Sequence, residues 1–573
     1  MAQQELFASK AVSPNRRNTL RLVTRLALSL GLTAAAAMAQ PAPAAVVNPA
    51  SNIPAGLPNA GIAQGSIFVV YGTGMGPGAI AQPSALPLPP SLGGTSISVT
   101  VNGTAVTAPM IYSLASQVAA VLPSNTPTGT GTLTVTYNGA SGSTPITVVQ
   151  SNFGISTVNQ SGVGAGVVTT PGYQLITGTN PAKPGDTVVL WGTGLGPING
   201  SDASLPSGGD LGTPITIYVG SATAKVVYRG RSGAPGLDQI NFVIPSGVTG
   251  CAVSLALVTQ GASAATASNT TTIPISADGG PCSDANGISL SGLTGALSKG
   301  SVAIGTIGLF QSSSTISISI PGAPTFNQTV TASGASASFF RYSASQFTQN
   351  AGSISTSASV GSCTVTTLRG SPSAGSSIPA AATYTGLDAG SSISLNLPSG
   401  SAVSLTGVQA AGKGIYSWSS QAALPAGVYK ASGPGGADVG AFTASLNFGQ
   451  PLNWTNQSAL VASGVNRAKP LQVTWTGGDP AGFVEIYGYS TMVTSGNNSL
   501  GALFTCIAPA GPGSFQIPPP VLLSLPASSV TSGIPTGFLG VGSVATPVLF
   551  NAPGLDLGVM SASSVAGSLV AFQ

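Results

Sequence analysis

Tyr71-Gly-Thr-Gly-Met-Gly-Pro77 and Trp191-Gly-Thr-Gly-Leu-Gly-Pro197 are two copies of one sequence pattern, about 120 residues apart. Each follows an apolar run rich in β-branched residues. Each also precedes a second matched segment, Gln117-Val-Ala-Ala-Val-Leu-Pro123 and Gln239-Ile-Asn-Phe-Val-Ile-Pro245. A duplication with two landmarks indicates two copies of one folded module.

Short runs around these landmarks alternate apolar residues with Thr or Ser, as in 95–101 and 214–219. This period of two is typical of half-buried β-strands. No helical pattern of ten or more residues follows residue 39. Short strands at regular spacing, with Gly and Pro between them, predict an all-β chain of antiparallel sandwiches of about 100 residues each.

The first 39 residues have the features of a secretory signal. Basic residues precede a short apolar run, 26–37, which ends in Ala37-Met38-Ala39, and cleavage is predicted before Gln40. The run is shorter than the roughly 20 apolar residues that span a bilayer. We find no longer one downstream. The sequence therefore predicts export to the periplasm, cell surface or medium, with no membrane span in the mature chain.

The formal net charge of +4 comes entirely from the signal segment. Residues 40–573 have equal numbers of basic and acidic side chains. Binding to nucleic acid needs clustered Lys and Arg, so no nucleic-acid partner is expected.

Changes in composition divide the chain into six segments. The predicted segments are a signal peptide (1–39), a Pro/Ala/Asn-rich linker (40–62), sandwich repeat 1 (63–150), sandwich repeat 2 (155–285), a Ser/Gly-rich β domain (286–450) and a C-terminal β-sandwich-like domain (451–573).

The chain has four cysteines, Cys251, Cys282, Cys363 and Cys506. An even number in an exported chain predicts disulfides. Three pairings are possible, and chain order favours Cys251–Cys282 with Cys363–Cys506. The first would close a loop of about 32 residues and stabilise by about 3–4 kcal/mol. The second would join 286–450 to 451–573 as one composite unit.

The chain contains no histidine. Ser-His-Asp and Cys-His machinery and His-containing metal sites are therefore excluded. No Asp/Glu pair stands out as a glycosidase constellation, and no Ser-x-x-Lys motif appears. The protein is predicted not to be an enzyme. The alternative is a His-free hydrolase with clustered carboxylates, or with a serine near Lys413 or Lys430.

The glycine-rich turns invite a nucleotide-binding interpretation, but Gly-x-Gly-x-x-Gly must open a helix. Here the sixth position is proline in both copies. The glycines are predicted to let the chain turn sharply with positive φ, and no cofactor is expected. These structural turn glycines are Gly72, Gly74, Gly76, Gly192, Gly194 and Gly196.

The oxygen-rich segment 278–287 lacks the spacing of a calcium-binding EF-hand loop. An ordinary Asx-rich turn is predicted there, and no metal site.

Aromatic residues near the C-terminus offer a possible ligand-stacking surface. Trp418 and Trp454 are the candidates, with Tyr487 and Tyr489, although a core or interface position is favoured even for Trp418, the best candidate for exposure. Trp191 and Trp475 are predicted to be core residues, since aromatic side chains dominate packing.

The second repeat resembles a known family. Asn180-Pro-Ala-Lys-Pro-Gly-Asp186 and the segment 236–245 are similar to the uncharacterised C-terminal domain of exported acidobacterial proteins, which is itself similar to the immunoglobulin-like IPT/TIG sandwich. The match covers about 155–285, and repeat 1 fits more loosely. The resemblance implies tandem IPT/TIG-like sandwiches, outside the cell and without assigned catalytic residues, followed by a further β-sandwich region.

The predicted function is therefore adhesion or scaffolding by an exported, non-enzymatic protein. The partner would be an extracellular protein or polysaccharide. Besides the hydrolase, two alternatives remain open. One is a carbohydrate-binding protein that uses the C-terminal aromatic residues, and the other is a structural envelope component that pairs through uncharged edge strands.

Overall fold

The strands of the first repeat begin at residue 42 in a computed structural model of the chain. Residues described are 40–260, 265–284, 294–318, 326–344, 358–370, 384–408, 413–493, 499–531 and 534–573. The predicted signal segment lies outside them. Within the described residues, no helix is long and apolar enough to cross a membrane.

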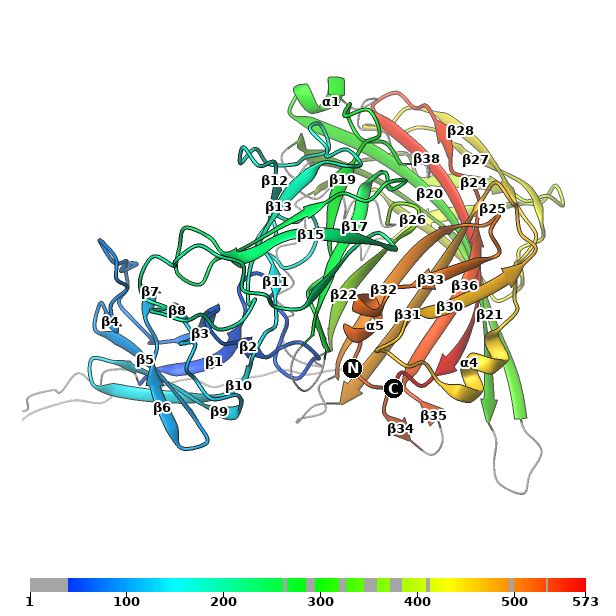
Figure 1. Ribbon diagram of the computed structural model, residues 1–573. Helices are drawn as coiled ribbons and strands as arrows, with labels where there is room; N and C mark the ends of the chain where they lie inside the picture. Colours follow the sequence, from blue (N-terminus) through cyan, green and yellow to red (C-terminus); the bar gives the residue numbers. More distant parts are fainter. Residues whose placement is uncertain are drawn as a thin grey trace, which may run out of the picture. The chain divides into compact units, whose positions relative to one another are not determined.

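The first repeat is a sandwich of two sheets (Figure 1), whose strands pair antiparallel except for β2 with β10. Its strands are β1 (Ala42–Val47), β2 (Ile62–Ala63), β3 (Ile67–Thr73), β4 (Ser91–Leu92), β5 (Thr95–Val101), β6 (Thr104–Thr107), β7 (Met110–Ser113), β8 (Gln117–Val121), β9 (Gly129–Tyr137) and β10 (Ala140–Val149). One sheet has the order β1-β3-β8-β7, and the other contains β10-β9-β5. Lettered A to G along the chain, these sheets are A-B-E-D and G-F-C, which is the immunoglobulin-like arrangement. We call this unit sandwich 1.

Alternation along the strands builds the core of sandwich 1. In β5, Ile97, Val99 and Val101 are fully buried, while the residues between them are half-buried. They pack between the two sheets with apolar residues of β3, β8 and β9. The predicted period of two is confirmed here, because side chains of a strand point alternately to its two faces.

The predicted linker at 40–62 is wrong for its first part. Ala42–Val47 forms β1, which pairs with β3 at the edge of the A-B-E-D sheet. Composition was misleading because proline is tolerated on edge strands, where a missing N–H leaves no ladder bond unmade. Pro43 sits in this edge strand next to a register shift.

The second repeat, sandwich 2, has the same strand order in slightly altered form. Its strands are β11 (Gly154–Ile155), β12 (Val168–Thr169), β13 (Thr187–Thr193), β14 (Ile215–Val219), β15 (Ala222–Arg231), β16 (Asp238–Val243), β17 (Gly250–Gln260), β18 (Ala265–Ala267) and β19 (Thr271–Ile275). Strand β15 pairs with β14 through Ala222–Ala224 and with β16 from Lys225 onward, and its ladder with β16 has a register shift between Val226 and Tyr228. A bulge of this kind lets one strand serve both sheets. Sandwich 1 uses the separate strands β6 and β7 at this place.

The remainder of the chain is built on one large sheet. Its strands and those of two small sheets are β20 (Ser301–Ile318), β21 (Phe326–Ser343), β22 (Ser362–Gly370), β23 (Tyr384–Gly386), β24 (Ser392–Asn396), β25 (Ala402–Gly407), β26 (Ile415–Ser420), β27 (Gly427–Gly433), β28 (Phe442–Phe448), β29 (Asn453–Trp454), β30 (Leu471–Thr476), β31 (Phe483–Val493), β32 (Ser499–Pro509), β33 (Ser514–Ile517), β34 (Val530–Thr531), β35 (Ile534–Pro535), β36 (Gly537–Val544), β37 (Val548–Phe550) and β38 (Leu557–Val570). The short helices are α1 (Thr294–Ser298), α4 (Gln457–Ser463) and α5 (Pro519–Leu523).

The large sheet runs in the order β22-β32-β31-β36-β38-β20-β21-β26-β25-β24-β27-β28. Strands from both sides of residue 450 are interleaved in it, since β22 pairs with β32 and β20 pairs in parallel with β38. The predicted division at 450 therefore does not separate the sheets. Two apolar cores lie along this sheet, and the second combines Cys363 and Val365 with residues after 450.

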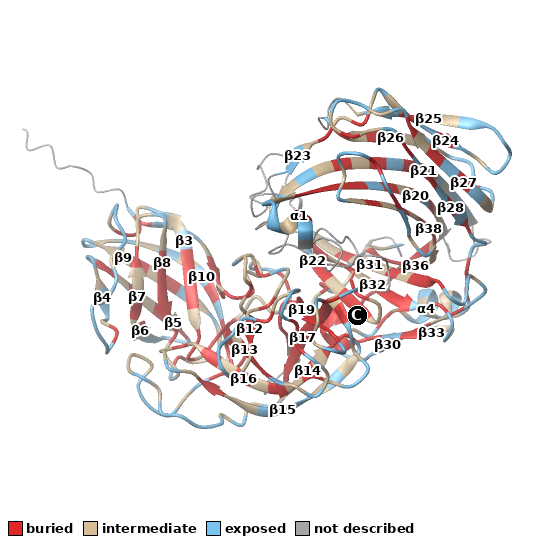
Figure 2. Ribbon diagram, turned by 90° about the horizontal axis from the view of Figure 1, so that it is seen from above, coloured by how far each residue is buried: buried red, intermediate tan, exposed pale blue. Residues whose placement is uncertain are grey.

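Strand β17 of sandwich 2 is buried along almost its whole length, as the colouring of Figure 2 shows. The backbone N–H of Ser254 donates to the Ser362 hydroxyl, and that of Cys363 donates to the Ser254 hydroxyl. Both faces of β17 are covered because β22 lies against it.

Candidate binding surfaces

The two Gly-Thr-Gly turns end equivalent strands, β3 and β13, but their backbone N–H groups have different partners. In sandwich 1 the Met75 N–H donates to the carbonyl of Ala115 at 3.1 Å. In sandwich 2 the N–H groups of Gly194 and Leu195 donate to Oδ2 of Asp238 at 2.7 and 2.8 Å. The second turn is therefore held by a side chain where the first is held by backbone.

The predicted positive φ holds for three of the six turn glycines. Gly74, Gly194 and Gly196 have φ of +67°, +118° and +125°. Gly72 and Gly192 do not; a Cβ on Gly72 would collide with the carbonyl of Ala42, and one on Gly192 with the carbonyl of Gly154. The positive-φ prediction is wrong for this pair, and for Gly76, where a Cβ would meet Ser113. These glycines allow close approach of neighbouring chain segments.

Asp238 forms a buried ion pair with Arg231 across the β15–β16 hairpin. Asp238 is 0% exposed and Arg231 is 4% exposed. Burial raises the pKa of the Asp238 carboxyl, and the Arg231 guanidinium and the two backbone N–H groups oppose that rise. An ion pair removed from water needs further hydrogen bonds to be tolerated. These come from the turn itself and from sandwich 1.

Arg231 links the two sandwiches. Its Nη2 donates to the carbonyl of Gly196 at 2.7 Å and to the carbonyl of Gly65, in sandwich 1, at 2.8 Å. The N–H of Ile67 donates to the Thr193 hydroxyl at 2.9 Å. Thr193 is buried, whereas the aligned Thr73 of sandwich 1 is exposed. The second turn is thus a docking surface for sandwich 1, and the first turn is not covered in this way.

A second polar contact supports the same junction. The backbone N–H and the hydroxyl of Ser124 donate to the two carboxylate oxygens of Asp202 at 2.7 and 2.8 Å. The N–H of Ile198 in turn donates to the Ser124 hydroxyl. Sequence reasoning missed both Asp202 and Asp238. A signal existed, because acidic residues appear in repeat 2 at positions that are uncharged in repeat 1.

The family-like segment 180–186 lines a cleft of about 540 Å³ in sandwich 2. Lys183, Asp186 and Asp278 contribute its charged groups. The Lys183 N–H donates to Oδ2 of Asp186 at 2.9 Å, which closes the turn before β13. The Asp186 carboxylate thus accepts a hydrogen bond within its own turn.

The segment after β19 forms the predicted Asx turn at 278–280, and residues 285–287 of the predicted segment lie outside the described residues. Oδ1 of Asp278 accepts the Gly280 N–H at 2.9 Å and the Ser276 hydroxyl at 2.7 Å. The Ser276 hydroxyl, followed by the Gly280 N–H, lowers the pKa of Asp278. Within the described residues, no group of three or more His, Cys, Asp or Glu is placed to hold a metal ion.

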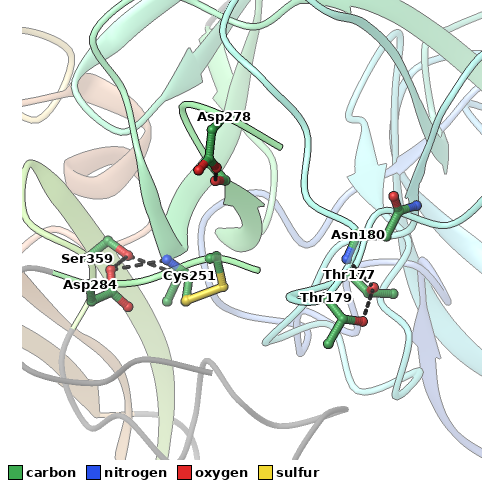
Figure 3. The surroundings of a disulfide bond; sticks show 10 residues. Thr177, Thr179, Asn180, Cys251, Asp278, Asp284 and Ser359 are labelled. Atoms are coloured by element: carbon green, nitrogen blue, oxygen red, sulfur yellow. Dashed lines mark hydrogen bonds between the residues drawn. A yellow bond between two sulfur atoms is a disulfide. The ribbon is translucent and has the colours of Figure 1, made fainter. Parts of the chain in front are cut away.

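Both disulfides follow the pairing that chain order favoured. Cys251 is bonded to Cys282, and Cys363 to Cys506, which lie directly opposite each other on β22 and β32. Figure 3 shows Asp284 beside the first bond, where it accepts hydrogen bonds from the Ser359 hydroxyl and the Cys251 N–H. Burial raises the pKa of Asp284.

The predicted stacking surface at Trp418 and Trp454 is not formed. Trp454 is 5% exposed in an apolar core, with its indole N–H donating to Asn456 at 2.9 Å. Trp418 is half-buried and packs against the other core of the large sheet. A strand pairing places Trp454 opposite Trp475, which is also buried, as predicted. Burial of these rings leaves no open pair of faces for a ligand.

Tyr487 and Tyr489 lie on the face of β31 opposite that core. Each ring stacks on Phe538, with ring centroids 5.5 Å apart. Glu485 is on the same face, and burial raises the pKa of its carboxyl. The Tyr487 and Tyr489 rings therefore contact Phe538 and are half-buried.

Neither lysine named for the hydrolase alternative is hydrogen-bonded to a serine in the described part of the chain. The Lys413 ammonium donates to Asp438 at 2.7 Å, and both groups are partly exposed. Lys430 is exposed on β27, and among the described residues no serine is hydrogen-bonded to its ammonium.

Comparison with known proteins adds little to this description. No family model matches the chain, and no curated protein matches it. Solved structures with some similarity include the tandem immunoglobulin domains of titin (10% identity, TM-score 0.13, covering 38% of this chain and 91% of that one). Others are immunoglobulin domains 1–4 of Sidekick-1 (9%, 0.12, 91% and 98%) and an endo-fucoidan hydrolase of glycoside hydrolase family 107 (10%, 0.11, 68% and 42%). With TM-scores this low, we base nothing on these likenesses; strand order alone makes the sandwiches immunoglobulin-like.

Proposed function

We propose that the protein is an exported, non-enzymatic scaffold for adhesion, whose tandem sandwiches act as one rigid piece. We also propose that both sandwiches are IPT/TIG-like members of the exported acidobacterial family that segment 180–186 resembles. Two disulfides fit a non-reducing destination.

The observation that supports this function best is the Arg231 bridge between the sandwiches. A flexible string of modules needs no buried ion pair at the joint. Here one guanidinium is shared by Asp238, the second turn and the backbone of sandwich 1. Removing either partner of such a pair is strongly destabilising, so the joint resists bending. Rigid spacing is what an adhesion scaffold requires of its modules.

The test is attachment of beads coated with the oxidised 40–573 chain to cell envelopes and to extracellular matrix polymers. Saturable attachment that is lost after reduction and alkylation of the disulfides is expected. Absence of attachment to every material would refute the adhesion role. Release of soluble fragments from a bound polymer would instead favour a hydrolase.

A further inference from the structure

Each sandwich carries an aromatic side chain beside a glutamine on the outer face of its A-B-E-D sheet. Tyr71 of β3 pairs with Gln117 of β8, and Trp191 of β13 pairs with Gln239 of β16. The residue before each aromatic is fully buried in the core. Since side chains alternate along a strand, both aromatic–glutamine pairs face away from the core. The prediction that Trp191 belongs to the core is therefore wrong.

A tyrosine of the D strand extends each pair. Tyr112 lies opposite Ala119, and Tyr228 lies opposite Asn241, on the same outer faces. Burial, and secondarily the neighbouring Tyr71, raises the pKa of Tyr112. We call Tyr71, Gln117 and Tyr112 the outer triad of sandwich 1, and Trp191, Gln239 and Tyr228 the outer triad of sandwich 2.

Aromatic surface is exposed to solvent at the outer triad of sandwich 1 and beside that of sandwich 2, where Trp191 itself is half-buried. Tyr71 is 41% exposed. In sandwich 2, the ring of Tyr173 lies 5.9 Å from that of Trp191 and is 70% exposed. Tyr173 has a φ of +64°, which is uncommon for a bulky residue and persists only where the surrounding structure holds it. Core packing does not explain a strained, exposed ring held against a second one.

Polar groups suited to hydroxyl recognition lie beside the rings. Nε2 of Gln239 donates to Oδ1 of Asn241 at 2.9 Å. Each amide offers two donor hydrogens and two acceptor lone pairs, so this bond leaves most of their capacity unused within residues 40–260. The Trp191 indole N–H donates to the Thr169 hydroxyl at 3.1 Å and fixes the ring orientation.

The charge of this region restricts the ligand. Residues 40–182 contain no Asp, Glu, Lys or Arg, so sandwich 1 has no ionic group of its own. In sandwich 2 the ion pair nearest to Gln239 in sequence, Arg231–Asp238, is buried and self-compensated. A charged ligand would have no opposite charge to pair with at the outer triad of sandwich 1. A neutral ligand rich in hydroxyl groups does not need one.

We propose that the two outer triads bind a neutral polysaccharide. This inference rests on the proposed adhesion function and names its partner. The C–H face of a sugar ring would lie on the aromatic face, which carries partial negative charge, and sugar hydroxyls would bond to the glutamine amides. Two equivalent triads on one rigid chain suit a polymer of repeating units, because the second contact is then intramolecular.

Affinity electrophoresis of the oxidised 40–573 chain tests the proposal. Gels contain a dissolved β-glucan, xylan or galactomannan, and alginate serves as the anionic comparison. We expect retardation by at least one neutral polymer and none by alginate. Trp191→Ala and Tyr71→Ala should each weaken binding about tenfold, with a larger loss when combined. Trp191→Phe should retain most of the binding.

Tyr384→Ala is the matched control, since Tyr384 is 48% exposed and lies on β23 of the large sheet. Its binding should equal that of the unaltered chain, and every variant should retain a cooperative thermal transition. No retardation by any neutral polymer, or retardation undiminished in the double variant, would overturn the inference. If beads still attach to envelopes in that case, the adhesion function stands and its partner is not a neutral glycan. If they do not, both fail.

Discussion

The first Gly-Thr-Gly turn is partly open to solvent at Thr73, whereas the second is buried beneath sandwich 1. Both turns end a B strand, and each has a glycine close to an A strand. They differ in the residue before the matched glutamine, which is Ser116 in sandwich 1 and Asp238 in sandwich 2. One carboxylate, with its arginine, changes a surface turn into a joint.

This difference shows how a duplicated module becomes a tandem unit without a new fold. The strands place the turn in both sandwiches. In sandwich 2, side chains of the β15–β16 hairpin add the contacts that join it to sandwich 1. A joint built on a buried ion pair is demanding, because each partner is costly without the other.

Asp238→Ala should lower the free energy of unfolding by about 3–5 kcal/mol, because Arg231 would remain buried without its partner. The Gly194 and Leu195 N–H groups would also lose their acceptor. Urea denaturation of the oxidised 40–573 chain measures this loss. Ser116→Ala is the matched control in sandwich 1 and should change stability by less than about 0.5 kcal/mol. Equal losses in the two variants would contradict the contrast between the turns.

Replacing both Cys251 and Cys282 by serine should destabilise sandwich 2 by about 3–4 kcal/mol, because the unfolded chain regains the freedom of the loop. Their separation is 31 residues. Differential scanning calorimetry of the unaltered and doubly substituted chains reports the change. Sandwich 1 has no cysteine, so a transition assigned to it should stay in place. A shift of all transitions together would mean that the two sandwiches unfold as one unit.

Gly194→Ala should cost about 2–3 kcal/mol, since its φ of +118° is outside the region open to alanine and a Cβ would meet the Asn152 carbonyl. Gly74→Ala should cost about 1 kcal/mol, because its φ of +67° is left-handed helical. Thermal melting of the two variants gives both values. The idea that the second turn is the more constrained one fails if Gly74→Ala is the worse substitution.

Asp284→Asn should give a small gain at neutral pH, about 1 kcal/mol or less. Burial raises the folded-state pKa of Asp284, so the folded chain binds more protons than the unfolded chain between the two pKa values. Its favourable contribution is thus complete below the unfolded pKa and is lost as pH rises through the folded pKa. The gain on substitution should accordingly vanish on acidification to about pH 3.5.

Asp278→Asn should change the pH dependence of stability in the opposite sense to Asp284→Asn, within the same sandwich. Hydrogen bonds lower the pKa of Asp278, so its contribution is present above the unfolded pKa and is lost as pH falls. Denaturation curves at pH 7 and pH 3.5 distinguish the two variants. Identical pH responses would show that local contacts do not set these pKa values.

Several features of the fold were predictable because they depend on neighbouring residues in the chain. Alternation located strands such as β5, and the repeat located the equivalent strands β3 and β13. The disulfide pairing followed from chain order. The candidate binding surfaces were harder to predict from the sequence. Trp454, a candidate for ligand stacking, is buried, whereas Trp191, which was expected in the core, faces outward. The face that a strand buries depends on which sheet covers it.

The all-β class, the duplicated module, the positions of the two Gly-Thr-Gly turns and the lack of histidine can all be recognised in the sequence without the fold. These are consequences of local spacing, backbone conformation and residue type. Tertiary structure alone decided that Arg231 reaches Gly65 and that strands on both sides of residue 450 share a sheet. It also decided that two aromatic–glutamine pairs face outward. Such contacts join residues far apart in the chain, and burial of a charge or a ring depends on what folds over it.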